Sequence, residues 1–427
     1  MNILVVGSGG REHAIIKKLK EGRPDLNIFA VPGNGGIASD AVCVPEISAK
    51  DIDKIADFAE KNKIDFAVVA LDDPLVLGAV DKLHEKGIPC FGPNKKAARI
   101  EGSKVFAKNL MQKYGIPTAK YSVFESADEA LGFLNATEFP VVVKADGLAL
   151  GKGVFICPDR DTAEKAIKEI MLNKIFGESG NKIVIEEYLT GPEVSVLCFT
   201  DGKTIIPMVS SMDHKRALDG DKGFNTGGMG TIAPNPYFTE EVAKECMEKI
   251  FIPTINALNA EDSKFKGCLY FGLMITKDGP KVIEYNCRFG DPETQVVLPL
   301  LKTDLLSIML ATENECLDSI DVEFYDKSAC CVVIASGGYP EKYETGFEIE
   351  IDEKSLPENI SIFQAGTKLR NGKLVTSSGR VLGVTAVADT LKQAIIDAYK
   401  ACSLISFTNC FYRKDIGQKA LEIINKK

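Results

Sequence analysis

The first hundred residues alternate between short apolar runs and longer stretches in which apolar residues recur at helical spacing. Buried strands are predicted at Ile3–Val6, Ile28–Val31, Phe66–Leu71 and Pro89–Phe91. Helices are predicted at Glu12–Lys20, at Asp51–Lys61 and in a segment that ends at Leu83. Strands that alternate with helices over short connections are typical of a parallel, doubly wound sheet. We therefore predict an α/β domain over residues 1–102.

Strands dominate the pattern farther along the chain, with fewer helices between them. The predicted strands are Val141–Lys144, Val154–Cys157, Ile183–Glu187, Val194–Phe199, Leu269–Thr276, Lys281–Tyr285 and Ala329–Ala335. The predicted helices are Lys104–Lys113 and a long one at Glu240–Leu258. The composition changes after about Lys327, so we expect a second domain over residues 103–326 and a small C-terminal α/β domain over residues 327–427.

Composition narrows the class of protein. The chain has 427 residues, more than one core usually organises, and its 45% hydrophobic and 26% charged residues are typical of globular proteins. The net charge of −9, without blocks of like charge, argues against nucleic-acid binding. No signal peptide or membrane span is recognisable, which favours the cytoplasm. Twelve scattered cysteines without a CxxC motif and only three histidines argue against disulfides and zinc.

Glycines follow the first predicted strand, in the turn Gly7–Glu12. Such a turn can direct backbone N–H groups at a phosphate, and Gly9, Gly10 and the turn containing Asn34 are candidates for that contact. A dinucleotide fingerprint is disfavoured because Glu12 occupies the third glycine position and no acidic residue ends the second strand. The alternative is that these residues form tight turns only.

A second glycine-rich segment, Val143–Val154, lies between two predicted strands. It is similar to a Walker A loop, but the spacing of its glycines is one residue short and no Ser or Thr follows Lys152. A flexible flap in a β-hairpin fits better, with Lys144 at its base and the backbone of Gly151 and Gly153 available to a triphosphate. A purely structural hairpin is the alternative.

Two acidic segments could complete a nucleotide site. In Ile183–Glu193 an apolar strand runs into a turn, so backbone groups could pair with adenine while Glu193 accepts ribose hydroxyls. In Lys281–Glu293 the strand period places Glu284, Asn286 and Arg288 on one face. The two oxygen-bearing side chains suit Mg²⁺, and the arginine could steady a phosphoryl or carboxylate group. The alternative is an ordinary surface strand with alternating polar residues.

A compact polar cluster, Asp213–Arg216, precedes the glycine-rich loop Asn225–Gly230. Such a loop allows the backbone to approach a small ligand closely. His214 could act as a general base, although an isolated histidine is more often structural.

These segments together resemble the phosphoribosylamine–glycine ligase family of ATP-grasp enzymes. The matching motifs are Gly7–Ala14, Lys144–Val154, Asp213–Arg216, Asn225–Gly230 and Glu284–Gln295. The resemblance spans nearly the whole chain and extends to Ala365–Thr367 and Gly379–Leu382.

The resemblance implies an ATP-grasp fold, with a lid at about residues 120–190 and ATP between the lid and the central domain. It implies the following ATP-binding residues: Lys104, Lys144, Gly151, Lys152, Gly153, Glu186, Glu187, Tyr188, Leu189 and Glu193. Glu284 and Asn286 would hold magnesium or manganese. Catalytic roles are expected for Arg288, Asp213 and Lys215. Substrate contacts are expected from Gly9, Gly10, Asn34, Asp72, Thr226, Gly227, Gly228, Met229 and Asp291.

The implied reaction joins glycine to 5-phosphoribosylamine through a glycyl phosphate in purine biosynthesis. A cytoplasmic monomer that does not bind nucleic acid or membranes is expected, with direct handover of the labile amine from the enzyme that makes it. The chain departs from the family pattern at Asp72, where glutamate is usual, at Gly223–Asn225 and at Gln364. Two alternatives stay open: another ATP-grasp ligase or carboxylase of nucleotide metabolism, and a nucleotide-sensing module without chemistry.

Overall fold

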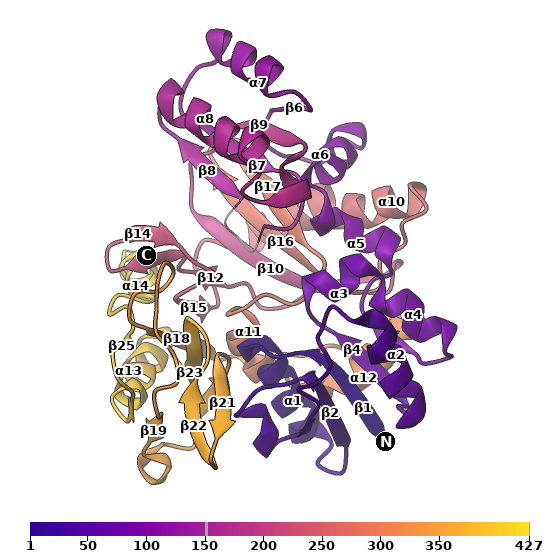
Figure 1. Ribbon diagram of the computed structural model, residues 1–427, viewed down its shortest axis with the longest axis vertical. Coiled ribbons are helices and arrows are strands. Elements are labelled where there is room, and N and C mark those ends of the chain that lie inside the picture. The colour runs from indigo at the N-terminus through magenta and orange to yellow at the C-terminus, as the bar shows by residue number, and fades with distance from the viewer. Residues whose placement is uncertain (150–152, 427) are drawn as a thin grey trace.

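The computed structural model describes residues 1–149 and 153–426. Figure 1 shows the N-terminal sheet with its helices, a small sheet called the lid at the far end of the long axis, long central strands between the two, and the C-terminal sheet beside the N-terminal one. The predicted flap residues Gly151 and Lys152 lie outside the described residues.

The N-terminal sheet is parallel, with strand order β3-β2-β1-β4-β5. Its strands are β1 (Asn2–Gly7), β2 (Asn27–Pro32), β3 (Val42–Cys43), β4 (Phe66–Val69) and β5 (Cys90–Phe91). Residues Ile3 to Val6 are fully buried, because helices or other elements cover both faces of the sheet. This arrangement confirms the predicted α/β class with a doubly wound N-terminal sheet.

The helices of this region are α1 (Gly10–Gly22), α2 (Ile52–Lys61), α3 (Asp72–Leu77), α4 (Ala79–Glu85) and α5 (Lys95–Gly102). The helix predicted to end at Leu83 is in fact two helices. Gly78 separates them with a left-handed φ of 99°, which ends α3 and redirects the chain.

The lid is a four-stranded sheet with order β6-β9-β7-β8. It contains β6 (Tyr121–Phe124), β7 (Val141–Ala145), β8 (Val154–Cys157), β9 (Ile183–Glu187), α7 (Ala127–Phe133), α8 (Arg160–Ile167) and the π-helical segment Lys168–Leu172. The antiparallel pairing of β7 with β8 confirms the predicted hairpin. The lid also has a hydrophobic cluster of its own, in which Val143, Ile167 and Ile185 are buried.

The central sheet is antiparallel with order β11-β10-β16-β17. Its strands are β10 (Glu193–Thr200), β11 (Ile205–Pro207), β16 (Gly267–Thr276) and β17 (Gly279–Asn286). The surrounding helices are α6 (Lys104–Lys113), α9 (Glu240–Cys246), α10 (Ile252–Ala260), α11 (Thr294–Leu300) and α12 (Leu305–Glu313). A π-helical segment, Met247–Phe251, joins α9 to α10, so the helix predicted from Glu240 is continuous to Ala260. One hydrophobic cluster includes both Leu4 and Phe271, so the central and N-terminal sheets share a core.

The C-terminal sheet has the order β12-β15-β18-β23-β20, with β25 paired to β18. Its strands are β12 (Met212–Asp213), β15 (Gly230–Ala233), β18 (Ser328–Ser336), β20 (Ile360–Gln364), β23 (Arg380–Ala388) and β25 (Cys410–Phe411). The helices are α13 (Leu391–Cys402) and α14 (Gln418–Ile424). Because β12 and β15 come from the middle of the chain, this sheet crosses the boundary predicted at residue 326, which stays a prediction.

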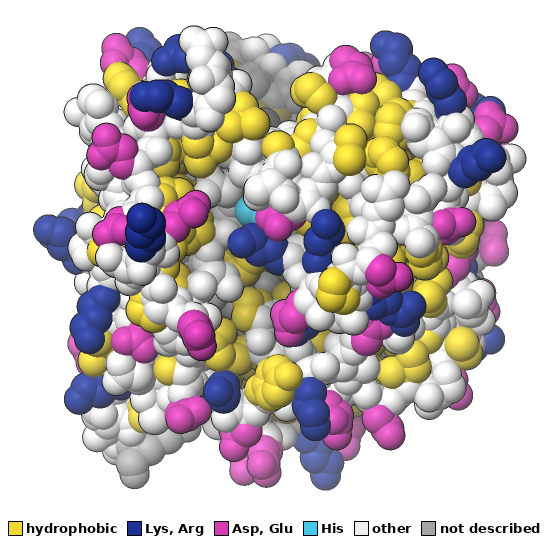
Figure 2. All heavy atoms as spheres, turned by 90° about the horizontal axis from the view of Figure 1, so that it is seen from below, with side chains coloured by type: hydrophobic (Ala, Val, Ile, Leu, Met, Phe, Trp, Pro, Cys, Tyr) yellow, Lys and Arg dark blue, Asp and Glu magenta, His cyan; other side chains and the backbone are white. Residues whose placement is uncertain are grey.

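Three small hairpins or pairs complete the fold. They are β13 (Arg216–Leu218) with β14 (Lys222–Asn225), β19 (Glu350–Ile351) with β24 (Ile405–Ser406), and β21 (Thr367–Arg370) with β22 (Lys373–Thr376). All twelve cysteines are free. Among the described residues no helix is long and apolar enough to cross a membrane. Figure 2 shows basic and acidic side chains interspersed over one face rather than gathered by sign.

Candidate active site

The base of the flap lies directly against the strand that carries the predicted metal ligands. Lys144, near the end of β7, donates to the Ile283 carbonyl in β17 at 3.0 Å. Its Nζ also lies 3.0 Å from Glu186 Oε2 in β9. Lid and central sheet therefore meet at the residue preceding Glu284, as a nucleotide site between them requires.

A second lysine, which was not predicted from the sequence, shares this carboxylate. Lys108 of α6 places its Nζ 3.1 Å from Glu186 Oε2, and both side chains are 3% exposed. Burial lowers the pKa of Lys108 to about 8. Glu186 Oε1 has no hydrogen-bond partner among the described residues. Two cations around one carboxylate leave a positive excess, which suits a polyphosphate.

The start of α6, with its N-cap Ser103, holds the other side of the flap. Lys104 donates to the Gly147 carbonyl at 3.0 Å, and burial lowers its pKa. Ser103 Oγ and the Val105 amide both donate to Asp146 Oδ1, at 2.9 and 2.8 Å. The Gly153 carbonyl, at the far end of the flap, accepts from the Ala145 amide at 2.9 Å.

The predicted adenine segment follows β9 along the edge of the lid. The Glu187 carboxylate accepts from the Lys120 amide at 3.0 Å and lies 3.5 Å from Lys281 Nζ. Tyr188 is exposed and Leu189 is half-buried. The Glu193 carboxylate lies 3.3 Å from Lys215 Nζ, so the segment ends next to the acid–base cluster.

Glu284, Asn286 and Arg288 lie together as predicted. Asn286 Oδ1 accepts from the Arg288 guanidinium at 3.1 Å. Glu284 Oε1 lies 3.6 Å from Lys215 Nζ, and this lysine, together with other nearby cations, lowers the pKa of Glu284 against the opposing effect of burial. An ionised carboxylate beside an amide oxygen is a hard-oxygen pair of the kind that Mg²⁺ prefers.

Asp213 lies near the buried carboxylate of Glu293. Burial, followed by this neighbouring charge, raises the pKa of Asp213 well above its usual value. The pKa of Glu293 is raised as well, chiefly by burial. Glu293 Oε1 accepts from Tyr270 at 3.2 Å. Carboxyl groups whose pKa is raised hold a proton more readily, which suits them to proton transfer.

His214 is structural. Its Nδ1 lies 3.1 Å from the Gly230 carbonyl and its Nε2 accepts from the Gly417 amide at 3.1 Å. This pairing fixes the neutral ring with the proton on Nδ1, because protonated Nε2 would face a donor. Both nitrogens are therefore occupied, which rules out general base catalysis by this ring.

The buried neutral His214 predicts acid destabilisation. Its pKa is lowered from 6.5 to about 4, chiefly by burial, so the unfolded chain binds more protons between these values. The stabilisation is complete above pH 6.5 and is lost as the pH falls toward 4, at a total of about 3 kcal/mol. We expect urea unfolding to show this loss between pH 7 and pH 4.5. His214→Gln, whose amide can make both hydrogen bonds, should flatten the slope; an unchanged slope would contradict the assignment.

The glycine-rich loop before β15 is held by backbone contacts. Thr226 donates through its amide and its hydroxyl to the Lys215 carbonyl, both at 2.8 Å. Gly228 has φ +120°, and an added Cβ would lie 2.7 Å from Asp213 Oδ1, so a larger residue would displace that carboxylate. Met229 is fully buried, and its backbone bonds to His214 and Val333, which favours a structural role over a substrate contact.

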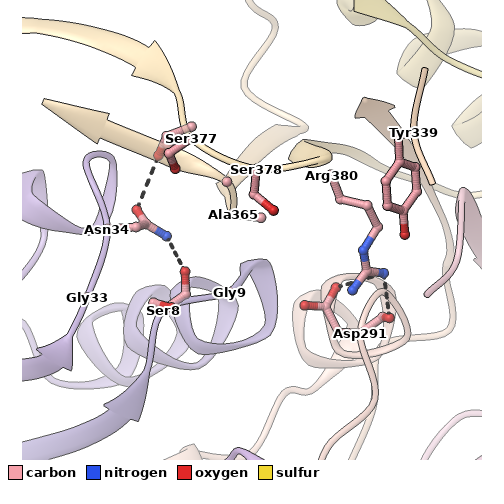
Figure 3. A pocket seen from close by; sticks show the side chains of 12 residues that line it. Ser8, Gly9, Gly33, Asn34, Asp291, Tyr339, Ala365, Ser377, Ser378 and Arg380 are labelled. Carbon is pink, nitrogen blue, oxygen red and sulfur yellow. Dashed lines mark hydrogen bonds and ion pairs between the residues drawn. The ribbon is translucent and has the colours of Figure 1, made fainter. Parts of the chain in front are cut away.

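A pocket of about 320 Å³ opens between the N-terminal turn, the Asp291 loop and the C-terminal sheet (Figure 3). The lining residues are Ser8, Gly9, Gly33, Asn34, Asp291, Tyr339, Ala365, Gly366, Thr367, Ser377, Ser378 and Arg380. Asn34 Nδ2 donates to the Ser8 carbonyl at 2.8 Å and to the Gln364 carbonyl at 2.9 Å, which joins two walls.

Arg380 connects the C-terminal sheet to the Asp291 loop, the third wall of the pocket. Its guanidinium donates to the carbonyls of Gly227 and Asp291, both at 2.8 Å, and lies 3.6 Å from Asp291 Oδ1. Gly9, Asn34 and Asp291 were predicted from the sequence as substrate contacts, whereas Tyr339, Ser377, Ser378 and Arg380 were not. The motif Gly379–Leu382 was the available sequence signal for Arg380.

The remaining predicted residues lie at the edges of this region. Gly10 permits close packing, because an added Cβ would lie 2.7 Å from Gln295 Nε2. The Gly9 amide donates to Glu12 Oε2 at 2.6 Å. Asp72 begins α3, and its charge interacts with Arg288 and Arg11, which oppose the effect of burial and lower its pKa.

Three family models match consecutive parts of the chain. They are described as the N domain (residues 1–101), the ATP-grasp (A) domain (residues 102–294) and the C domain (residues 329–419) of phosphoribosylglycinamide synthetase.

Similar proteins agree with these matches. A phosphoribosylamine–glycine ligase of Clostridium acetobutylicum is 50% identical over 419 residues, 98% of this chain and 100% of the relative. A crystal structure of phosphoribosylamine–glycine ligase from Thermotoga maritima has a TM-score of 0.84 and 33% identity, covering 97% of this chain and 100% of that one. A biotin carboxylase structure from Campylobacter jejuni has a TM-score of 0.76 at 16% identity, covering 100% of this chain and 96% of that one, and shows the fold alone.

Proposed function

Because this chain belongs to the phosphoribosylglycinamide synthetase family, we propose that it catalyses the ATP-dependent ligation of glycine to 5-phosphoribosylamine. The products are glycinamide ribonucleotide, ADP and phosphate, and the reaction belongs to purine biosynthesis. The observation that carries the proposal in this structure is the contact between Lys144 of the flap and Ile283, next to Glu284.

The arrangement suits activation of a carboxylate. An ionised carboxylate resists attack by an amine because its carbon is electron-rich and oxide is a poor leaving group. Transfer of the γ-phosphoryl group of ATP to glycine gives an acyl phosphate, and the phosphoribosylamine nitrogen then displaces phosphate and loses a proton. The protein contributes in-line positioning, charge neutralisation and exclusion of water.

We assign the nucleotide to the region between the lid and β17. Lys104 and Lys144 would contact its phosphates, residues Glu186 to Leu189 its adenine and Glu193 its ribose. The flap residues Gly151, Lys152 and Gly153 would cover the phosphates. The lysines around Glu186 support this assignment because they already supply the positive charge.

Glu284 and Asn286 would hold magnesium or manganese. The two residues fit this role, since both offer hard oxygen atoms and the pKa of Glu284 is lowered. When bound, the metal would neutralise charge on the phosphates. Arg288 would bind the glycine carboxylate or the transferring phosphoryl group. Asp213 would accept the proton that the amine loses, and Lys215 would neutralise negative charge beside it.

Phosphoribosylamine would occupy the pocket of Figure 3. Serine hydroxyls, backbone amides and Arg380 are suitable donors for a sugar phosphate. Gly9, Gly10, Asn34 and Asp291 would contact it or shape its walls. Asp72 would contact the sugar of phosphoribosylamine, and the loop from Thr226 to Gly228 would contact a substrate.

Arg380→Met should weaken phosphoribosylamine binding selectively. Loss of charge-assisted hydrogen bonds that order two pocket walls should raise the KM for phosphoribosylamine about 10- to 100-fold. The KM for ATP should stay within about twofold, since the nucleotide site lies elsewhere. Steady-state kinetics with each substrate varied would measure both. Arg370→Met is the matched control, because Arg370 is exposed and donates to the Gly346 carbonyl, away from the pocket. An equal rise in both KM values would contradict the assignment of the pocket.

The decisive test of the function is ADP formation that depends on both glycine and freshly prepared phosphoribosylamine. We expect one ADP per glycinamide ribonucleotide formed. Glycine-independent ADP formation with bicarbonate or formate would instead indicate another ATP-grasp ligase or carboxylase. Nucleotide binding without turnover would indicate a sensing module.

The wider context is also proposed. We assign the N-terminal domain to residues 1–102, the ATP-grasp domain to residues 103–326 with its lid at about 120–190, and the C-terminal domain to residues 327–427. We further propose a cytoplasmic monomer without nucleic-acid or membrane partners. Direct handover of phosphoribosylamine would leave flux unchanged when a trap for the free amine is added, and full interception by the trap would rule handover out.

A further inference from the structure

One buried carboxylate beside the site has no role in the reaction described above. Glu101 lies in the last turn of α5 and is 8% exposed. Its Oε1 accepts from the Arg288 guanidinium at 2.9 Å, and its Oε2 accepts from the Cys287 amide at 2.7 Å. One side chain therefore holds both the arginine and the backbone immediately before it.

The hydrogen bonds of Arg288 fix the plane of its guanidinium. One terminal nitrogen donates to Glu101 Oε1 and to Asn286 Oδ1, and the other donates to the Phe289 carbonyl at 3.2 Å. Nε is buried and has no partner among the described residues. The Nε–H is thus left without an acceptor in the described part of the protein, while the terminal nitrogen on the same edge donates to Glu101 and Asn286.

More than one carboxylate lies near Arg288, so its orientation depends on which of them it contacts. Asp72 lies close enough to affect the pKa of Arg288, and Glu101 affects it more strongly. Without Glu101, the guanidinium would lose its hydrogen bond to that carboxylate, and Asp72 would be the strongest remaining negative charge, toward which we expect it to turn. The long arginine side chain would also regain rotamer freedom that the present contacts remove.

Glu101 is connected to the flap through the next turn of the chain. Ser103, two residues later, donates to Asp146 Oδ1 at 2.9 Å, and the Lys104 amide donates to the Asp146 carbonyl at 2.9 Å. The same short segment therefore contacts Arg288 on one side and the base of the flap on the other. The position of Arg288 is defined relative to the strand that carries Lys144.

We propose that Glu101 is the positioning residue for Arg288: it holds the guanidinium beside Asn286 and leaves the Nε–H for the reacting carboxylate or phosphoryl group. The assignment of that ligand rests on the proposed function. The contacts by which Glu101 holds Arg288 are independent of that function.

The test uses Glu101→Gln in the full chain. The substituted amide keeps one acceptor but places an NH₂ group against a donor, so it can satisfy the Cys287 amide or Arg288, not both. We expect kcat to fall about 10- to 100-fold, as for loss of a group that orients an active-site ligand. The KM for ATP should stay within about twofold. Glu348→Gln, which removes the charge of an exposed ion pair with Lys373, is the matched control and should keep full activity.

A double-mutant cycle separates positioning from a general structural effect. In an Arg288→Lys background, Glu101→Gln should lower kcat less than about threefold, because an ammonium group has no guanidinium plane for Glu101 and Asn286 to fix. An equal loss in both backgrounds, or a kcat of Glu101→Gln within about threefold of the native value, would overturn the proposal. If Glu101→Gln does not fold, Glu101→Asp takes its place, since it keeps the charge but withdraws the carboxylate.

A crystal structure of the variant gives a readout that does not depend on the reaction. We expect the Arg288 guanidinium to leave Asn286 Oδ1 and turn toward Asp72. An unmoved guanidinium would overturn the proposal even if activity fell. Conversely, absence of glycine-dependent ADP formation in the native protein would remove the proposed function and leave this structural test valid.

Discussion

Glu284→Ala is expected to abolish ligation and metal binding together, with kcat lowered about 10³-fold, corresponding to several kcal/mol of lost charge stabilisation. The described residues contain no group of three or more His, Cys, Asp or Glu side chains that could hold a metal. A cation would therefore depend on Glu284 and Asn286 together with phosphate oxygens and water. Removing one of these two protein ligands should therefore cause a large loss of both metal affinity and kcat.

Mn²⁺ binding in the presence of ADP, followed by electron paramagnetic resonance, measures the first effect, and ADP release measures the second. Glu323→Ala is the control, because Glu323 is exposed and pairs with Lys302 at the surface. Near-normal turnover of Glu284→Ala at ordinary magnesium concentrations would show that the metal lies elsewhere.

Lys144→Met is expected to lower kcat/KM for ATP about 10²- to 10³-fold, the range found when a preorganised group that stabilises developing charge is removed. The variant should fold, because Lys108 still pairs with Glu186 at 3.1 Å and the methionine stem fills similar volume. The loss therefore reports on the nucleotide and not on an unpaired buried carboxylate.

Lys182→Met, in the same lid, provides the comparison. Lys182 is partly exposed and pairs with Glu125, so its loss should change kcat/KM for ATP less than about twofold. Thermal unfolding of both variants would check that the lid is intact. If Lys144→Met retained native ATP kinetics, the flap lysine would have no part in phosphoryl transfer.

Local sequence patterns predicted the elements that depend on neighbouring residues. The apolar run at Ile3–Val6 identified β1, because a strand covered on both faces has no polar alternation. The alternation through Glu284 and Asn286 identified β17 and its polar face. Glycines between two apolar runs predicted the hairpin of β7 and β8, since glycine tolerates tight turns readily.

Contacts between distant segments could not be predicted from these patterns. The contacts of Lys108, Glu101 and Arg380 were not predicted, because a periodic pattern does not tell which carboxylate or carbonyl a long side chain will meet. The two-residue strands β3 and β12 are too short to have a period. The joining of β15 to β18 also depends on tertiary packing, so the extent of the C-terminal sheet was not apparent from the sequence.

The pocket of Figure 3 has walls from the beginning, the middle and the last quarter of the chain. Synthesis on the ribosome proceeds from the N-terminus, and domains fold as they emerge. When the growing chain has reached Arg288, the lysines and carboxylates of the proposed nucleotide site have already been synthesised, but Ser377, Ser378 and Arg380 have not. Nascent copies should therefore acquire affinity for ATP before they acquire affinity for a sugar phosphate.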